Sequence, residues 1–151
     1  MNYEIDDKLI KNVNKSLKSK FEDATFYDNN VLKGLKTPCI FLRIADTNIK
    51  RLLNDRLKFD FVVSATYVPE KENFKKMAVS NIRDIQMKLL IALEKIETDT
   101  GFLYASDVRS ETNYDEFGVS INAMATYSIT YHTVRSKNYM LKLVKEGSVK
   151  E

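Results

Sequence analysis

The sequence is poor in the residues that build redox, metal and nucleotide sites. It has one cysteine (Cys39), one histidine (His132) and four glycines in 151 residues. A single cysteine excludes an intrachain disulfide and a thiolate metal cluster, as is usual in a reducing compartment. One histidine in a sequence that offers no second histidine is a poor candidate for a metal ligand, and four scattered glycines cannot form a phosphate-binding loop. The sequence therefore predicts neither a metal nor a cofactor.

Long apolar runs are absent as well. No stretch approaches the roughly 18 apolar residues that a membrane-spanning helix needs. The opening residues, MNYEIDDKLIKN, carry acids where a signal peptide needs bases followed by an apolar segment. These features predict a soluble protein that is made in the cytoplasm and has no membrane partner.

Catalytic groups are equally sparse. No G-x-S-x-G nucleophile elbow is present, and Cys39 lies in an apolar segment with only His132 as a possible base. The adjacent acids Asp115 and Glu116 fall in a highly charged stretch, where carboxylates are usually solvated. The sequence favours a protein without enzymatic activity.

The longest regular pattern covers residues 119–133. Odd positions carry Val, Ile, Ala and Tyr, whereas even positions are polar apart from Met124. Because side chains alternate across a strand, the pattern predicts one strand with a core face and a wetter face. It is much longer than the usual strand of about 5–6 residues, so we expect it at the centre of a sheet.

The rest of the chain predicts a single α+β domain. Its segments are assigned as helices over 4–21 and 72–97 and strands over 24–27, 39–45, 58–68 and 102–109. Residues 46–57 are assigned as a long hairpin connection that can include a helical turn, and residues 110–118 as a polar loop. We expect a mostly antiparallel sheet of four to five strands with two helices on one side, in the order α-β-β-β-α-β-β.

The predicted domain comprises residues 1–135, and residues 136–151 form a C-terminal extension. The extension contains an apolar cluster that includes Tyr139, Leu141 and Leu143. Two interpretations stay open for this cluster: a last strand of its own sheet, or an arm that pairs with another subunit.

Charge is distributed unevenly, although the net charge is only +3. Residues 33–58 hold seven bases against two acids, and residues 94–116 hold seven acids against two bases. If these segments lie on opposite flanks, one copy can dock its basic flank on the acidic flank of the next. Such a head-to-tail contact closes into a ring when the rotation allows. Ordinary mixed surface charge is the alternative explanation.

A nucleic-acid-binding α+β module is the other function that the sequence admits. Tyr127 and Tyr131 share one face of the long predicted strand, and a basic loop lies elsewhere in the chain, as in sheet-based stacking platforms. The characteristic RNP octamer is missing, however. The tyrosines also share their parity with Ile121 and Ile129, which favours a core position.

The segment from Gly34 to Pro69 resembles the signature of the phage tail terminator (tail completion) family. The matching positions are Gly34, Pro38, Cys39, Leu53, Asp55, Arg56, Phe59 and Asp60. The order of the predicted elements also agrees over the whole chain. Asn54-Asp55 stands where the family pattern has a glycine-asparagine pair before the arginine.

The resemblance implies a hexameric ring that caps the head-proximal end of a tail tube and stops its polymerisation. The implied partners are further copies of the chain, the tube protein, the sheath protein if the tail is contractile, and a neck or collar protein. Nucleic acid is implied only if DNA passes through the ring. The implied location is the tail of a phage, or of a headless phage-tail-like bacteriocin.

Contacts within such an assembly are expected from three groups of residues. They are the basic loop (Lys50, Arg51, Arg56, Lys58), the acidic segment (Glu111, Asp115, Glu116) and the C-terminal cluster (Tyr139, Leu141, Leu143).

Overall fold

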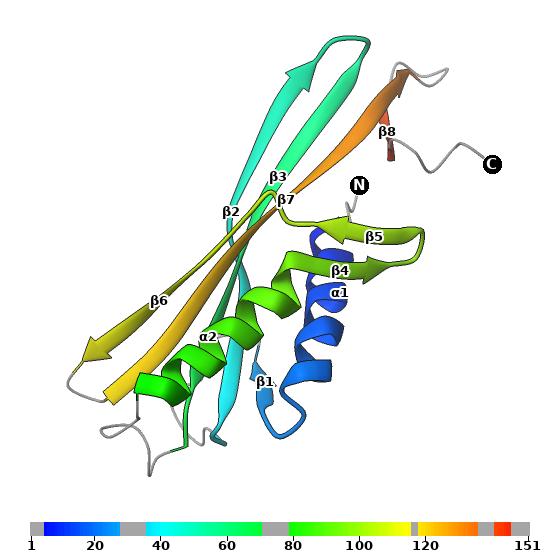
Figure 1. The fold of residues 1–151 in the computed structure, drawn as a ribbon. Coiled ribbons are helices and arrows are strands. Elements are labelled where there is room, and N and C mark those ends of the chain that lie inside the picture. Colours follow the sequence, from blue (N-terminus) through cyan, green and yellow to red (C-terminus); the bar gives the residue numbers. More distant parts are fainter. Residues whose placement is uncertain (1–4, 28–35, 71–78, 116–117, 136–140, 146–151) are drawn as a thin grey trace.

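The computed structural model describes residues 5–27, 36–70, 79–115, 118–135 and 141–145 and shows an α+β fold (Figure 1). The elements, in chain order, are α1 (Ile5–Lys20), β1 (Thr25–Tyr27), β2 (Cys39–Leu52), β3 (Arg56–Val68), α2 (Val79–Glu94), β4 (Lys95–Thr98), β5 (Gly101–Tyr104), β6 (Asp107–Asp115), β7 (Gly118–Arg135) and β8 (Leu141–Lys145). The predicted fold class and element order are confirmed.

The main sheet is organised around β7, as the alternating pattern predicted. The strands follow the order β1-β2-β3-β7-β6, and β8 pairs with the far end of β7. All neighbours are antiparallel except β1 and β2. Strands β4 and β5 form a separate hairpin.

Both helices lie on the same face of the main sheet (Figure 1). Leu9, Val13 and Leu17 of α1 are buried, because their four-residue spacing places them on one side of the helix. Leu89 and Leu93 of α2 are fully buried for the same reason. They meet the apolar side of β7, where Ile121, Ala123, Ala125 and Tyr127 are all inaccessible to solvent.

Tyr127 joins the sheet to α2. Its ring is fully buried, and its hydroxyl donates a hydrogen bond to the carbonyl oxygen of Leu93. Burial raises the pKa of Tyr127 above its usual value near 10, and the negative charge of Glu94 raises it further. The phenol therefore stays protonated in the folded protein at pH values where it ionises in the unfolded chain.

This pKa shift predicts a loss of stability in alkali. Above about pH 10 the unfolded chain releases the tyrosine proton and the folded chain keeps it, so the free energy of unfolding falls as pH rises. The slope approaches about 1.4 kcal/mol per pH unit for one such group. Urea titrations between pH 8 and 11 should show the fall, and Tyr127→Phe should make it shallower. An unchanged slope in that variant would contradict the assignment.

The predicted hairpin between β2 and β3 is present, but the predicted length of its connection, residues 46–57, and the helical turn are wrong. Strand β2 continues to Leu52 and β3 begins at Arg56, so most of this segment is a β-hairpin. The connection is only Leu53-Asn54-Asp55, in which Asn54 and Asp55 have φ values of 62° and 55°. Asn and Asp tolerate this left-handed conformation better than other non-glycine residues, so they close the turn.

The boundaries around α2 also differ from the prediction. The helix ends at Glu94, and Lys95–Thr98 forms β4, whereas residues 72–78 lie outside the described residues. The strand predicted over 102–109 is two strands of different sheets, which separate at Ala105-Ser106. Strand β5 pairs with β4 in a hairpin whose turn is Asp99-Thr100, and Gly101, the first residue of β5, has a φ of 139° that favours glycine.

The predicted polar loop over 110–118 is wrong as well, because β6 extends to Asp115 and β7 begins at Gly118. Thr112 of β6 accepts a hydrogen bond from Gln86 Nε2 of α2 at 3.0 Å. Because β6 contacts α2 partly through polar side chains, its sequence lacks the alternation of apolar residues that would have predicted a strand. At the C-terminus, β8 pairs with β7 of its own chain, the first of the two predicted alternatives.

Candidate functional site

The β2–β3 hairpin projects beyond the two helices (Figure 1). We call its outer part, residues 47–60, the hairpin arm. Strand β2 has 14 residues and β3 has 13, both far longer than the usual 5–6. A register shift between Ile44 and Asp46 leaves Ala45 as a bulge at the base of the arm. A bulge increases the local twist of a strand and exchanges the faces to which later side chains point.

One face of the hairpin arm is basic. Lys50 lies opposite Lys58, and Arg56 lies opposite His132 of β7. Arg56 Nε donates a hydrogen bond to the carbonyl oxygen of Leu53 at 3.1 Å, which ties this side chain to the turn. Because alternate residues share a face, Lys50, Arg56 and Lys58 point the same way.

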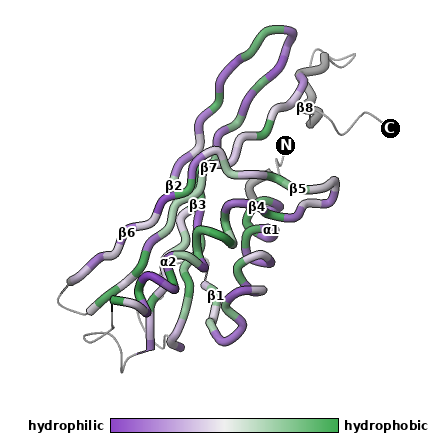
Figure 2. Tube along the Cα trace, viewed as in Figure 1, coloured by the Kyte–Doolittle hydropathy of each residue, from purple (hydrophilic) through white to green (hydrophobic). Residues whose placement is uncertain are grey.

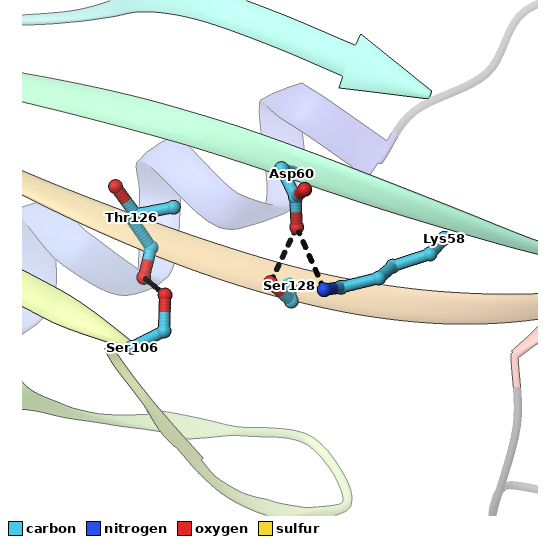
Figure 3. Close-up of polar contacts among 5 residues, drawn as sticks. All are labelled: Lys58, Asp60, Ser106, Thr126 and Ser128. Carbon is cyan, nitrogen blue, oxygen red and sulfur yellow. Dashed lines mark hydrogen bonds and ion pairs between the residues drawn. The ribbon is translucent and has the colours of Figure 1, made fainter. Parts of the chain in front are cut away.

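Asp60 offsets part of this positive charge (Figure 3). Its carboxylate lies 3.8 Å from Lys58 Nζ and accepts a hydrogen bond from the Ser128 hydroxyl. An exposed ion pair of this kind stabilises a protein by about 0–1 kcal/mol. The ion pair therefore adds little stability, and the Lys58 side chain stays 39% exposed beside it.

The opposite face of the hairpin arm is apolar. Ile49 and Phe59 are cross-strand partners, and the ring of Phe59 contacts Tyr131 edge-to-face with centroids 5.6 Å apart. Ile49 is 59% exposed, and Leu53 at the turn is 82% exposed. Arg51 shares this face with Ile49. The structure thus brings together three of the four predicted basic residues and places Arg51 on the other side.

Figure 2 shows hydrophilic and hydrophobic segments mixed along the hairpin arm. Exposed large apolar side chains on a projecting element are unfavourable in water unless a partner covers them. Ile49 and Leu53 are two such exposed apolar side chains on the hairpin arm.

The predicted acidic residues lie on a different strand. Glu111 is exposed on β6 opposite Asn122, and Asp115 ends β6 opposite Gly118. Glu116 lies outside the described residues. Strands β3 and β7 separate β6 from β2, so the acidic and basic segments occupy opposite edges of the sheet. This placement of β2 and β6 is the condition on which the head-to-tail docking hypothesis depends.

The C-terminal cluster is described only in part. Leu141 and Leu143 belong to β8, opposite Arg135 and Thr133 of β7, and Tyr139 lies outside the described residues. Strand β8 therefore extends the sheet beside the far end of β7.

The residues considered for nucleic-acid binding and catalysis lie in other environments. Tyr127 is buried in the core, so it is unavailable for base stacking, and Tyr131 is half-buried against Phe59. Cys39 is fully buried, and burial raises the pKa of its thiol, which disfavours the reactive thiolate.

No group of three or more His, Cys, Asp or Glu side chains is placed to hold a metal ion in the part of the chain that the structure describes. In the same part, neither helix has the length and apolar character needed to cross a membrane.

Comparison with protein families shows which family the chain resembles over most of its length. Residues 8–139 match the family described as phage tail terminator proteins, which is most of the chain. The chain belongs to the phage tail terminator family. The match includes the hairpin arm, β6 and β7, and it confirms the resemblance seen in the Gly34–Pro69 segment. Among curated proteins no match was found.

Membership of the tail terminator family gives the protein a structural role in the phage tail. Two features of its surface were not predicted from sequence: the length of the hairpin arm, and the exposure of Ile49 and Leu53. The Asn54-Asp55 pair was the available signal, since such pairs favour left-handed turn positions.

Proposed function

We propose that this tail terminator acts by forming a ring, most simply a hexamer, on the head-proximal end of the tail tube. The ring covers the surface on which the next layer of subunits would assemble and presents a different surface to the neck or collar. Growth of the tube, and of the sheath in a contractile tail, then stops. This function requires a ring that fits the tube end and binds it tightly, and it requires no chemical reaction.

The observation that carries this proposal is the projecting hairpin arm. Its basic face and its exposed apolar residues lie together on an element that extends past the helices. In the proposed complex the arm contacts the tube end. Burial of Ile49 and Leu53 supplies affinity, and Lys50, Arg56 and Lys58 supply electrostatic selection of the partner.

Tail length measures the proposed function directly. Phage or tail particles made without this protein should have tubes of variable length, because nothing stops polymerisation. Supplying the protein from a plasmid should restore one length. Tubes of uniform, normal length in the absence of the protein would contradict a capping role.

Removal of residues 138–151 tests the contribution of the C-terminal extension. This truncation removes β8, whose described strand partner is Tyr131–Arg135 at the far end of β7. We expect the domain to stay folded and its assembly on tails to weaken by about tenfold or more, a change of about 1.4 kcal/mol. Circular dichroism and co-sedimentation with tails measure the two effects. Unchanged assembly would rule out a role for this extension in subunit contacts.

A further inference from the structure

Strand β6 forms an open edge of the main sheet. It has nine residues and pairs with β7, and no other described strand lies beside it. Asp107 and Glu111 are exposed and lie on one side of the strand, with Arg109 between them. An unpaired strand edge presents a row of backbone N–H and C=O groups to any chain that reaches it.

Strand β2 forms a second open edge on the opposite side. The short strand β1 covers only Cys39–Phe41, so among the described residues Leu42–Leu52 pairs with β3 alone. The uncovered part carries Arg43, Lys50 and Arg51 against one acid, Asp46. One open edge is thus mainly basic and the other mainly acidic.

The directions of the strands make the two edges compatible. Strands β2, β3, β7 and β6 are successively antiparallel, so β6 runs opposite to β2. When identical copies stand side by side around an axis, β6 of one copy is therefore antiparallel to β2 of the next. Antiparallel pairing then continues across the boundary with every strand in its usual orientation.

We propose that β6 of one subunit pairs with the uncovered part of β2 of its neighbour, which makes one continuous sheet around the ring. The occupant of each open edge is a second copy of this chain. Backbone hydrogen bonds supply affinity, and the opposite charges select this contact over like-edge pairing. The contact is heterologous, so its repetition closes into a ring when the rotation between neighbouring subunits allows it. This inference depends on the proposed ring and specifies how its subunits meet.

Cysteine cross-linking on assembled tails tests the pairing. Glu111→Cys is combined in one chain with a single cysteine on the same face of β2, at position 43, 46, 48 or 50. Within a subunit β6 and β2 are three strand spacings apart, about 14 Å, so an intrachain disulfide cannot form. We expect cross-linked multimers at one preferred position. Cys39 is buried, so the otherwise unaltered chain should show no cross-links.

Antiparallel pairing also predicts how the preferred cross-linking position changes. Moving the β6 cysteine from position 111 to 113 should move the preferred β2 position towards Arg43. Movement the other way, or equal cross-linking at all positions, would overturn the pairing.

Charge exchange provides an independent test. Arg43→Glu with Lys50→Glu makes the β2 edge acidic, and Asp107→Lys with Glu111→Lys makes the β6 edge basic. Each double variant should assemble at least about tenfold more weakly, because like charges then face each other. An equimolar mixture of the two should assemble again, since their edges are complementary. Failure of the mixture would contradict the inference.

The two tests separate the inference from the function on which it depends. A ring at the tube end without β6–β2 cross-links overturns the inference and leaves the capping function intact. Absence of any oligomer, in solution or on tails, overturns both.

Discussion

Replacing Arg51 and Arg56 together by glutamate should abolish capping and yield tails of variable length. The two side chains occupy opposite faces of the hairpin arm, so the double change places negative charge on both surfaces proposed to meet the tube. Like charges at a contact cost several kcal/mol, enough to weaken binding by a hundredfold or more. Electron microscopy of tail lengths and co-sedimentation of the variant with tubes measure the effect.

A matched control separates this effect from the change in net charge. Lys11→Glu with Lys15→Glu produces the same charge change on the exposed side of α1, far from the arm in the sequence. We expect capping by this control to be normal. Tails of wild-type length, still capped, with the Arg51/Arg56 variant would show that the arm is not the contact surface.

Replacing Leu89 by alanine should cause the largest loss of stability. Leu89 is fully buried where α2 meets the sheet, and its removal leaves a cavity lined by side chains that cannot collapse into it. Substitutions of this kind cost about 2–5 kcal/mol. Because small domains are stable by only about 5–15 kcal/mol, the variant should unfold at much lower urea concentration.

Ile91→Ala is the control for this prediction. Ile91 lies on the same helix two residues away, and it is 55% exposed. Its replacement should change the free energy of unfolding by less than about 0.5 kcal/mol. Equal losses in the two variants would mean that α2 packs on the sheet through a different face.

The helices and strands that were predicted correctly are those with one buried face and one solvent-exposed face. Val119–Thr133 alternates because one face of β7 packs on helices, and Leu9, Val13 and Leu17 recur at four-residue spacing because α1 lies on the sheet. Burial on one side imposes a period on the sequence, and that period can be read without a structure.

The two strand segments that were predicted as loops lack this difference in burial between their two faces. Residues 47–52 are exposed on both faces of the arm apart from the half-buried Leu52, so Thr-Asn-Ile-Lys-Arg-Leu shows no alternation. Strand β6 meets α2 partly through Thr112 and Gln86, and polar partners leave no apolar period. In both segments the strand is stabilised by backbone hydrogen bonds to its neighbour, and these bonds leave no hydrophobic pattern in the sequence.

The candidate site was predicted as a group of residues but not as a surface. The four bases of the arm are close in sequence, so the sequence predicted them as one group, and the structure divides them between two faces. Their division between two faces depends on the register of the hairpin beyond the Ala45 bulge and on the position of the turn at Asn54-Asp55. Neither the register of the hairpin nor the position of its turn can be predicted from a periodic pattern of apolar residues.

The position of the subunit in the assembled particle tests the account most directly. Cryo-electron microscopy of tails carrying this chain should show one closed ring of copies at the head-proximal end of the tube, with the hairpin arms directed at the last tube layer. Copies distributed along the tube, or a single copy bound away from its end, would contradict a terminator that works by capping.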